Sequence, residues 1–271
     1  MNALVLSGGG VLGALHLGAL HRRSCGTKYQ VIAGTSIGAI VGVLLAVGYE
    51  PLELLRVFVR LQEPLVKPDI QIDKFGAASQ QPLVTLLERL LKDKCDGRIL
   101  TLREMHTHFG VDLIITGTNM TDMRGEYFHR HAYPYMSVLD ALRVTSCVPL
   151  LFPYVKYNDR RYVDGFVTDN FPLAFTRRYV QEHYPDSEFV FHAQNITHRR
   201  VIKHTDGFQG YVQALFNLFL DSKKYEYGPV RVLDLAPNPH TNVSMMHYTQ
   251  QDIEQLFNDG YDYHLKNTDT Q

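Results

Sequence analysis

The sequence has few cysteines, and they lie far apart. Its 271 residues include only Cys25, Cys95 and Cys147. No C-x-x-C pair occurs, so neither a zinc site nor a disulfide framework is indicated. Isolated cysteines are typical of a reducing environment, which predicts an intracellular protein, either cytoplasmic or peripheral on membranes.

Charge of one sign is not in excess either. The chain carries 27 basic and 28 acidic residues, for a formal net charge of −1. A nearly neutral protein has no overall field that would attract nucleic acid or an anionic membrane. We therefore expect no nucleic-acid partner.

Signals for membrane insertion and for metal binding are also missing. The N-terminus has no basic segment, so no signal peptide is expected. The longest apolar stretch, residues 31–49, is interrupted by glycines, and a buried strand, turn and helix explain it better than a transmembrane span. No H-E-x-x-H pair or EF-hand loop occurs, so we expect neither a metal nor an organic cofactor.

Acidic residues are absent from the first 49 positions, and this absence bears on a glycine motif. Residues Gly8–Gly13 match the G-x-G-x-x-G dinucleotide fingerprint. That fingerprint needs an Asp or Glu about 20 residues later to hold the ribose. The first acid is Glu50, so a nucleotide-binding oxidoreductase remains only as an alternative.

Alternating strands and helices in the first 50 residues predict the fold class. Strands are expected at 3–7 and 30–34 and helices at 11–23 and 36–49. Both strands are apolar throughout, which is typical of a parallel sheet covered on both faces. The prediction is an α/β three-layer sandwich with a mostly parallel central sheet flanked by helices.

The rest of the chain continues this pattern without an internal repeat or linker, so one domain is predicted over 1–271, with a core at about 3–263. A hairpin is expected at 154–166, with its turn at Asn158–Asp159. A turn-rich stretch, 63–82, is expected to be a loop. Further helices are expected at 51–62, 83–94, 137–149, 210–224 and 249–266, and further strands at 111–120, 125–131, 188–196 and 230–237.

The stretch "GTSIG" has the spacing of a nucleophile elbow around Ser36. Gly34 and Gly38 leave room for the strained turn between strand and helix. Parallel strands end at the same edge of a sheet, so the loop Gly8–Gly10 is expected beside Ser36. Backbone N–H groups in such a loop can stabilise an oxyanion. The alternative is two glycine-rich turns that merely pack together.

A serine nucleophile needs a base within hydrogen-bond reach. None of the 13 histidines lies in a motif that marks it as catalytic, and His192 is the best histidine candidate. Asp164 in "RYVDGF" is a sharper candidate, because Gly165 permits a tight turn that can aim the carboxylate. The alternative is that Asp164 only forms an Asx-turn.

Together, "SGGGVLG", "GTSIG" and "VDGF" resemble, in their order and separation, the motifs of the patatin-like phospholipases. The segments "SCVPLLFP", "DNFP" and "TQQDIEQLFNDGY" are similar to that family's flanking regions. The resemblance implies a Ser36–Asp164 dyad without a histidine. It also implies an oxyanion hole at Gly8, Gly9 and Gly10, with Gly13, Gly34, Gly38, Gly165 and Phe166 as supporting motif positions.

The family reaction would be hydrolysis of a lipid carboxylic ester through an acyl-enzyme, of phospholipase A or lysophospholipase type. It would require no metal or organic cofactor. Phe166 departs from the family pattern, which has Ala or Gly there, so a catalytically weak lipid-binding relative is a further alternative. The apolar positions of 208–224 suggest peripheral membrane contact, although a helix face packed on the core is the simpler explanation of them.

Overall fold

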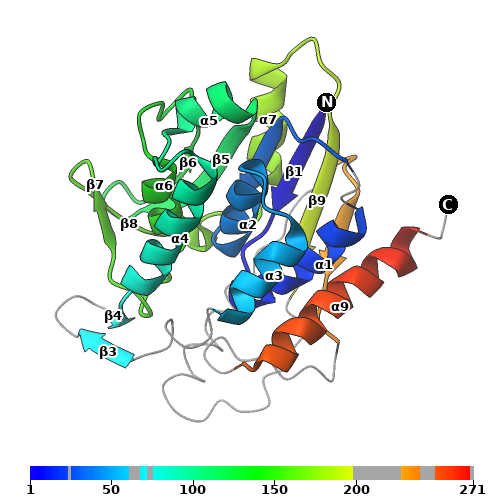
Figure 1. Cartoon of the computed structure of the whole chain (residues 1–271). Coiled ribbons are helices and arrows are strands. Elements are labelled where there is room, and N and C mark those ends of the chain that lie inside the picture. The colour runs from blue at the N-terminus through cyan, green and yellow to red at the C-terminus, as the bar shows by residue number, and fades with distance from the viewer. Residues whose placement is uncertain (24–25, 61–67, 72–75, 198–226, 239–247, 269–271) are drawn as a thin grey trace.

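The structure is a computed structural model that describes residues 1–23, 26–60, 68–71, 76–197, 227–238 and 248–268. Its centre is a mixed sheet with the strand order β10-β9-β1-β2-β5-β8-β7, and β6 pairs with β5 beyond this path (Figure 1). The parallel strands are β1 (Asn2–Leu6), β2 (Val31–Gly34), β5 (Asp112–Asn119), β9 (Val190–Ile196) and β10 (Val232–Leu235). The antiparallel ones are β6 (Arg124–Phe128), β7 (Val155–Tyr157) and β8 (Arg160–Asp164).

Helices cover both faces of this sheet, which explains why its strands are apolar on both sides. In β1, Leu4 and Leu6 point into the larger core, while Ala3 and Val5 point into the smaller one. The smaller core is covered by α7 (Leu173–His183). The larger core is covered by α1 (Gly13–Arg23), α2 (Ile37–Ala46), α3 (Pro51–Arg60), α4 (Gln81–Lys94), α5 (Leu102–Phe109), α6 (Val138–Thr145) and α9 (Gln250–Thr268). The predicted α/β sandwich is confirmed.

One local prediction was wrong, and one helix was not predicted. The stretch 63–82 is not a plain loop, because β3 (Pro68–Gln71) and β4 (Gly76–Ala78) form an antiparallel pair and α4 begins at Gln81. Such short strands lack the alternation by which strands are predicted. Helix α5 was not predicted, although Thr101 and Glu104 form a capping box at its start. The helix expected at 210–224 lies outside the described residues.

The register of the parallel strands brings two loops together. Leu6 at the end of β1 pairs with Gly34 at the end of β2, and Gly34 pairs with Ile115 of β5. The segments that follow β1 and β2 therefore start side by side at the carboxyl edge of the sheet. No helix within the described ranges is both long and apolar enough to cross a membrane.

Candidate active site

Ser36 occupies a strained turn between β2 and α2. Its backbone has φ 53° and ψ −124°, in a region that residues with a side chain rarely adopt. The two glycines of the motif are needed because the chain is crowded here. A Cβ on Gly38 would lie 2.5 Å from the carbonyl oxygen of Ser7, and one on Gly34 would lie 2.5 Å from the nitrogen of Ala39. The turn has the geometry of a nucleophile elbow.

The turn holds the hydroxyl of Ser36 against Asp164, which lies 128 residues later in the chain. Ser36 Oγ donates a hydrogen bond of 2.7 Å to Asp164 Oδ2. Asp164 is the last residue of β8 and pairs with Gly117 of β5, which places it level with the elbow. Ser36 is 9% exposed and Asp164 is fully buried. Water therefore competes little for this hydrogen bond.

The second carboxylate oxygen of Asp164 has a different role. Asp164 Oδ1 accepts a hydrogen bond of 2.9 Å from the N–H of Phe166 and caps a short 3-10 helix, Gly165–Val167. The Asx-turn and the contact with Ser36 therefore occur together, one on each oxygen. A Cβ at Gly165 would collide with the hydroxyl of Thr116, so only glycine fits after the aspartate.

Burial raises the pKa of Asp164 from 3.8 to about 7, while its hydrogen bonds from Phe166 and Ser36 act in the opposite direction. The dominant cause is desolvation, because a buried carboxylate loses the water that stabilises its charge. A carboxyl group with this pKa is matched to accepting and returning a proton near neutral pH.

The glycine loop follows β1 and packs against the elbow. A Cβ at Gly8 would lie 3.4 Å from Cβ of Ser36, and one at Gly13 would collide with Ile37. The N–H of Gly8 donates to the carbonyl of Asn170 at 3.1 Å. The N–H groups of Gly9 and Gly10 donate to no atom in the described part of the chain.

The carbonyl groups of this loop are held in place. The Gly8 carbonyl accepts from Ser7 Oγ at 3.2 Å and from Asn170 Nδ2 at 3.4 Å. The Gly9 carbonyl accepts from the N–H of Leu12 at 3.1 Å, at the start of the 3-10 helix Gly10–Leu12. Because each peptide unit is planar and trans, fixing its carbonyl also fixes the direction of the following N–H.

A buried histidine supports the start of this loop. His16 of α1 is fully buried, with Nε2 2.9 Å from the carbonyl oxygen of Ser7 and Nδ1 3.0 Å from Gln194 Oε1. Burial lowers the pKa of His16 to about 4, so the ring is neutral at neutral pH. In the neutral ring, Nε2–H donates to the carbonyl of Ser7, and Nδ1 can only accept a hydrogen bond. The amide group nearest Nδ1 must therefore be the NH₂ of Gln194, with the oxygen and nitrogen of that amide interchanged.

His192, the best histidine candidate from the sequence, lies elsewhere, and so does His129. His192 is in the amino half of β9, where its Nε2 is 3.1 Å from Asn2 Oδ1. His129 follows β6 at the amino edge and contacts the rings of Tyr179 and Phe175. Among the described residues, no histidine forms a hydrogen bond with Ser36 or Asp164.

Two threonines that sequence reasoning missed also contact the pair. The N–H of Ser36 donates to Thr145 Oγ1 at 2.9 Å, and Thr118 Oγ1 donates to the carbonyl of Asp164 at 2.9 Å. Each contact anchors the backbone that carries Ser36 or Asp164. No sequence signal could have found them, because each is a single threonine within an ordinary helix or strand.

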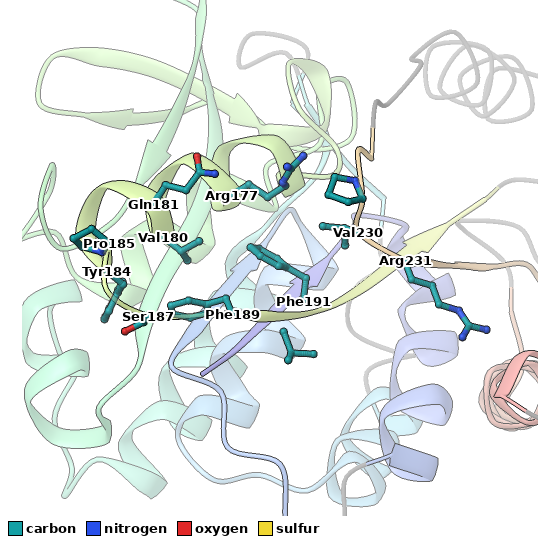
Figure 2. Close-up of a pocket in the computed structure, with 12 residues that line it drawn as sticks. Arg177, Val180, Gln181, Tyr184, Pro185, Ser187, Phe189, Phe191, Val230 and Arg231 are labelled. Atoms are coloured by element: carbon teal, nitrogen blue, oxygen red, sulfur yellow. The ribbon is translucent and has the colours of Figure 1, made fainter. Parts of the chain in front are cut away.

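A cavity of about 520 Å³ lies elsewhere, between α7 and the beginning of β9 (Figure 2). Its walls include Val180, Tyr184, Phe189 and Phe191, and none of its lining residues belongs to the elbow, the glycine loop or the Asp164 turn. Val190 in its wall pairs with Asn2, which places it at the amino edge of the sheet. Within the described ranges, no group of three His, Cys, Asp or Glu side chains could hold a metal ion.

Comparisons with known proteins show which family this sequence matches. Residues 4–176, which include the glycine loop, Ser36 and Asp164, match the family described as patatin-like phospholipase. A protein of invertebrate iridescent virus 6 named "Probable lipid hydrolase 463L" is 27% identical over 95% of this chain and 85% of its own length. The "Uncharacterized protein R571" of Acanthamoeba polyphaga mimivirus is 27% identical, over 63% of this chain and 60% of its own length.

Solved structures show a similar fold. VipD from Legionella pneumophila matches 99% of this chain and 67% of its own, with a TM-score of 0.66 and 15% identity. At that identity the likeness concerns the fold alone. The family match covers well over half of the sequence, and the chain therefore belongs to the patatin-like phospholipase family.

Proposed function

We propose that this protein hydrolyses the carboxylic esters of lipids, in the manner of a phospholipase A or lysophospholipase, with Ser36 as nucleophile and Asp164 as base. The observation that carries the proposal is the buried 2.7 Å hydrogen bond from Ser36 Oγ to Asp164 Oδ2 at the strained elbow. Membership of a lipid hydrolase family supports the substrate class.

In the first step, Asp164 Oδ2 takes the proton of Ser36 while Oγ attacks the ester carbonyl carbon. The carbonyl oxygen then carries the negative charge. When the tetrahedral intermediate collapses, the bond to the leaving alcohol breaks, and Asp164 returns the proton to the alcohol oxygen. The hydrogen bond already aligns donor and acceptor for this transfer, which is the geometric requirement for general base catalysis.

The developing oxyanion needs donors that are already oriented. In the proposed arrangement these are the N–H groups of Gly9 and Gly10, because the N–H of Gly8 already donates to Asn170. The carbonyls of Gly8 and Gly9 are held by other partners, so both N–H groups have fixed directions without the substrate. Of the three glycines expected to form the oxyanion hole, the proposal therefore uses the N–H groups of Gly9 and Gly10 and leaves out Gly8.

In the second step, water replaces the alcohol. Asp164, ionised again, takes a proton from the water molecule as it attacks the acyl carbon, and then returns that proton to Ser36 Oγ as the acyl chain leaves. A pKa of about 7 suits this alternation, because the carboxyl group is neither too weak a base nor too weak an acid. No step requires a histidine.

Phe166 is the unusual residue beside this machinery. Its side chain is buried, and its backbone N–H donates to Asp164 Oδ1, a contact that every residue except proline can make. We propose that it shapes the space available to the acyl chain and so affects the preferred chain length.

The proposal is tested with a panel of phospholipids, lysophospholipids and neutral glycerides, with products identified by mass spectrometry. Ser36→Ala should abolish both hydrolysis and labelling by a fluorophosphonate probe. Ser187→Ala, which lies at the distant cavity, is the matched control and should keep both. Lipid hydrolysis by Ser36→Ala at the rate of the unmodified protein would contradict the proposal.

A further inference from the structure

Two methionines on one turn are exposed at the edge of the sheet where the elbow lies. The turn connects β5 to β6, and Met123 in it is 86% exposed and Met120 45% exposed. Among the residues that the structure describes, the other large apolar side chains that are exposed lie singly along the sequence, which is ordinary for a protein surface. Two on one turn form a small apolar tip.

This tip stands beyond the candidate active site. Ile115 of β5 is level with Gly34, the last residue of β2, and β5 continues to Asn119. Four further residues of strand extend roughly 13 Å at about 3.3 Å per residue. A flat surface that approaches the carboxyl edge of the sheet would therefore contact the turn between β5 and β6 before it reaches Ser36.

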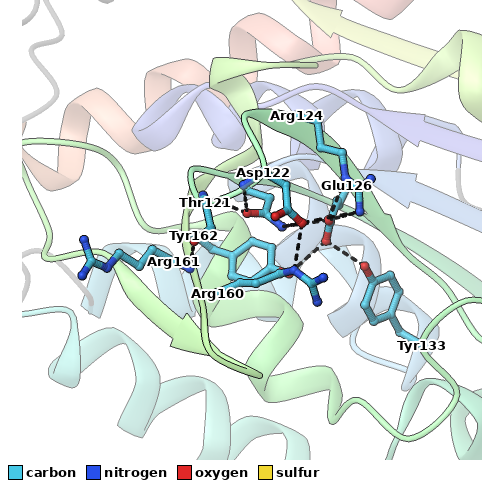
Figure 3. Close-up of polar contacts among 9 residues, drawn as sticks. Thr121, Asp122, Arg124, Glu126, Tyr133, Arg160, Arg161 and Tyr162 are labelled. Carbon is cyan, nitrogen blue, oxygen red and sulfur yellow. Dashed lines mark hydrogen bonds and ion pairs between the residues drawn. The ribbon is translucent and has the colours of Figure 1, made fainter.

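The turn is held rigidly in this position. Asn119 Oδ1 accepts hydrogen bonds of 2.9 Å from the N–H groups of Thr121 and Asp122, and Thr121 Oγ1 accepts one from the N–H of Arg161. Asp122 also pairs with Arg160 at 2.8 Å, as Figure 3 shows. The turn is thus tied both to itself and to the neighbouring strand β8.

Met123 has an unfavourable backbone conformation within this network. Its φ is 53°, which is costly for a long side chain and which glycine or asparagine would adopt more easily. Strain of this kind persists only where the surrounding contacts enforce it, and it is often found at functional positions. A flexible thioether side chain is well suited to contact with a heterogeneous apolar surface.

Charge around the tip is nearly balanced. Two arginines, Arg124 and Arg160, face the carboxylates of Asp122 and Glu126, whereas the side chain of Arg161 points away from them (Figure 3). Arg124 and Arg160 are bound in ion pairs with these acids. Attraction to an anionic surface is therefore small, and contact would depend on the two methionines.

We propose that the turn Asn119–Arg124 is the element by which this protein contacts a neutral lipid surface, with Met123 and Met120 inserted among the lipids. This inference rests on the proposed function, because a lipid hydrolase must meet its substrate at such a surface. It assigns the contact to a different segment from 208–224, which lies outside the described residues.

The test is sedimentation with phosphatidylcholine vesicles, using the full chain with Ser36→Ala so that no lipid is consumed. This parent protein should bind, and binding should persist in high salt because it is apolar. Adding Met123→Asp should lower the partition coefficient at least tenfold, whereas Met123→Leu should preserve it. Tyr135→Asp is the matched control, because Tyr135 is 76% exposed in the loop after β6 and should not affect binding. Melting temperatures confirm that each variant is folded.

The proposal is overturned if the parent does not bind neutral vesicles, if binding requires anionic lipid and disappears in salt, or if Met123→Asp binds as well as the parent. It is also overturned if Tyr135→Asp weakens binding equally. Because Ser36 is absent throughout, these outcomes are independent of hydrolysis. A protein that binds through Met123 and hydrolyses nothing would refute the proposed function alone.

Discussion

Replacing Asp164 with Asn should stabilise the protein while removing its activity. The carboxyl group is buried at a cost that appears as its raised pKa, about 7 in place of 3.8. The amide of Asn is nearly isosteric. It can still accept from the N–H of Phe166, and its NH₂ can donate to Ser36 Oγ. The variant therefore keeps the contacts and loses the buried charge.

The size of the effect depends on pH in a defined way. Below about pH 4, Asp164 is protonated in both states and contributes nothing. Between about pH 4 and pH 7, the folded protein holds a proton that the unfolded chain releases, so stability falls by roughly 1.4 kcal/mol per pH unit. Above about pH 7 the loss stays constant, on the order of 4 kcal/mol in total.

The assay is urea unfolding of the unmodified protein and Asp164→Asn at several pH values from about 5 to 8. Other groups that titrate, such as the buried His16, His129 and His192 with pKa values lowered to about 4, affect both proteins alike. Their contributions therefore cancel when the free energies of unfolding of the two proteins are subtracted. The advantage of the variant should grow up to about pH 7 and then level off. An advantage that does not change with pH would refute the raised pKa.

Three further predictions concern the glycine loop, the closing helix and metal ions. His16→Phe, which cannot donate to the carbonyl of Ser7, should lower kcat at least tenfold and leave KM within about threefold. His16→Gln should retain more of the original kcat, and an equal loss of kcat in both variants would contradict a positioning role for His16. Gly260→Ala should cost about 1–3 kcal/mol in urea unfolding, because a Cβ would collide with the carbonyl of Leu15 where α9 crosses α1, and a gain in stability would contradict this. Hydrolysis should be unchanged in excess EDTA, and a loss restored only by calcium would argue for a metal mechanism.

Local patterns were sufficient for the elements that surround the site. The apolar strands β1 and β2, their glycine-rich turns and the Asn158–Asp159 hairpin turn all follow from short-range rules of backbone conformation. Ser36 and Asp164 could be proposed because each lies in a recognisable turn. Their assignment as a pair depended on resemblance, since they are 128 residues apart and no periodicity connects them.

The remaining features depend on tertiary contacts that a linear pattern does not encode. His16 resembles any other helix residue in the sequence, yet packing buries it against Ser7 and Gln194. The positive φ of Met123 follows from the contacts of Asn119 and Asp122 with their neighbours. That the chain folds as one domain over 1–271 stays a prediction.

The central claim is that Asp164, and no histidine, activates Ser36. The most direct measurement is the rate of hydrolysis of a short-chain nitrophenyl ester by purified Asp164→Asn, His129→Ala and His192→Ala, with circular dichroism to confirm the fold. Asp164→Asn should lose several orders of magnitude, as removal of one member of a serine–base unit commonly does. The two histidine variants should stay within about tenfold of the unmodified protein, because neither ring forms a hydrogen bond with Ser36 or Asp164 among the described residues. An active Asp164→Asn beside an inactive histidine variant would show that this is a triad hydrolase and that the dyad is wrong.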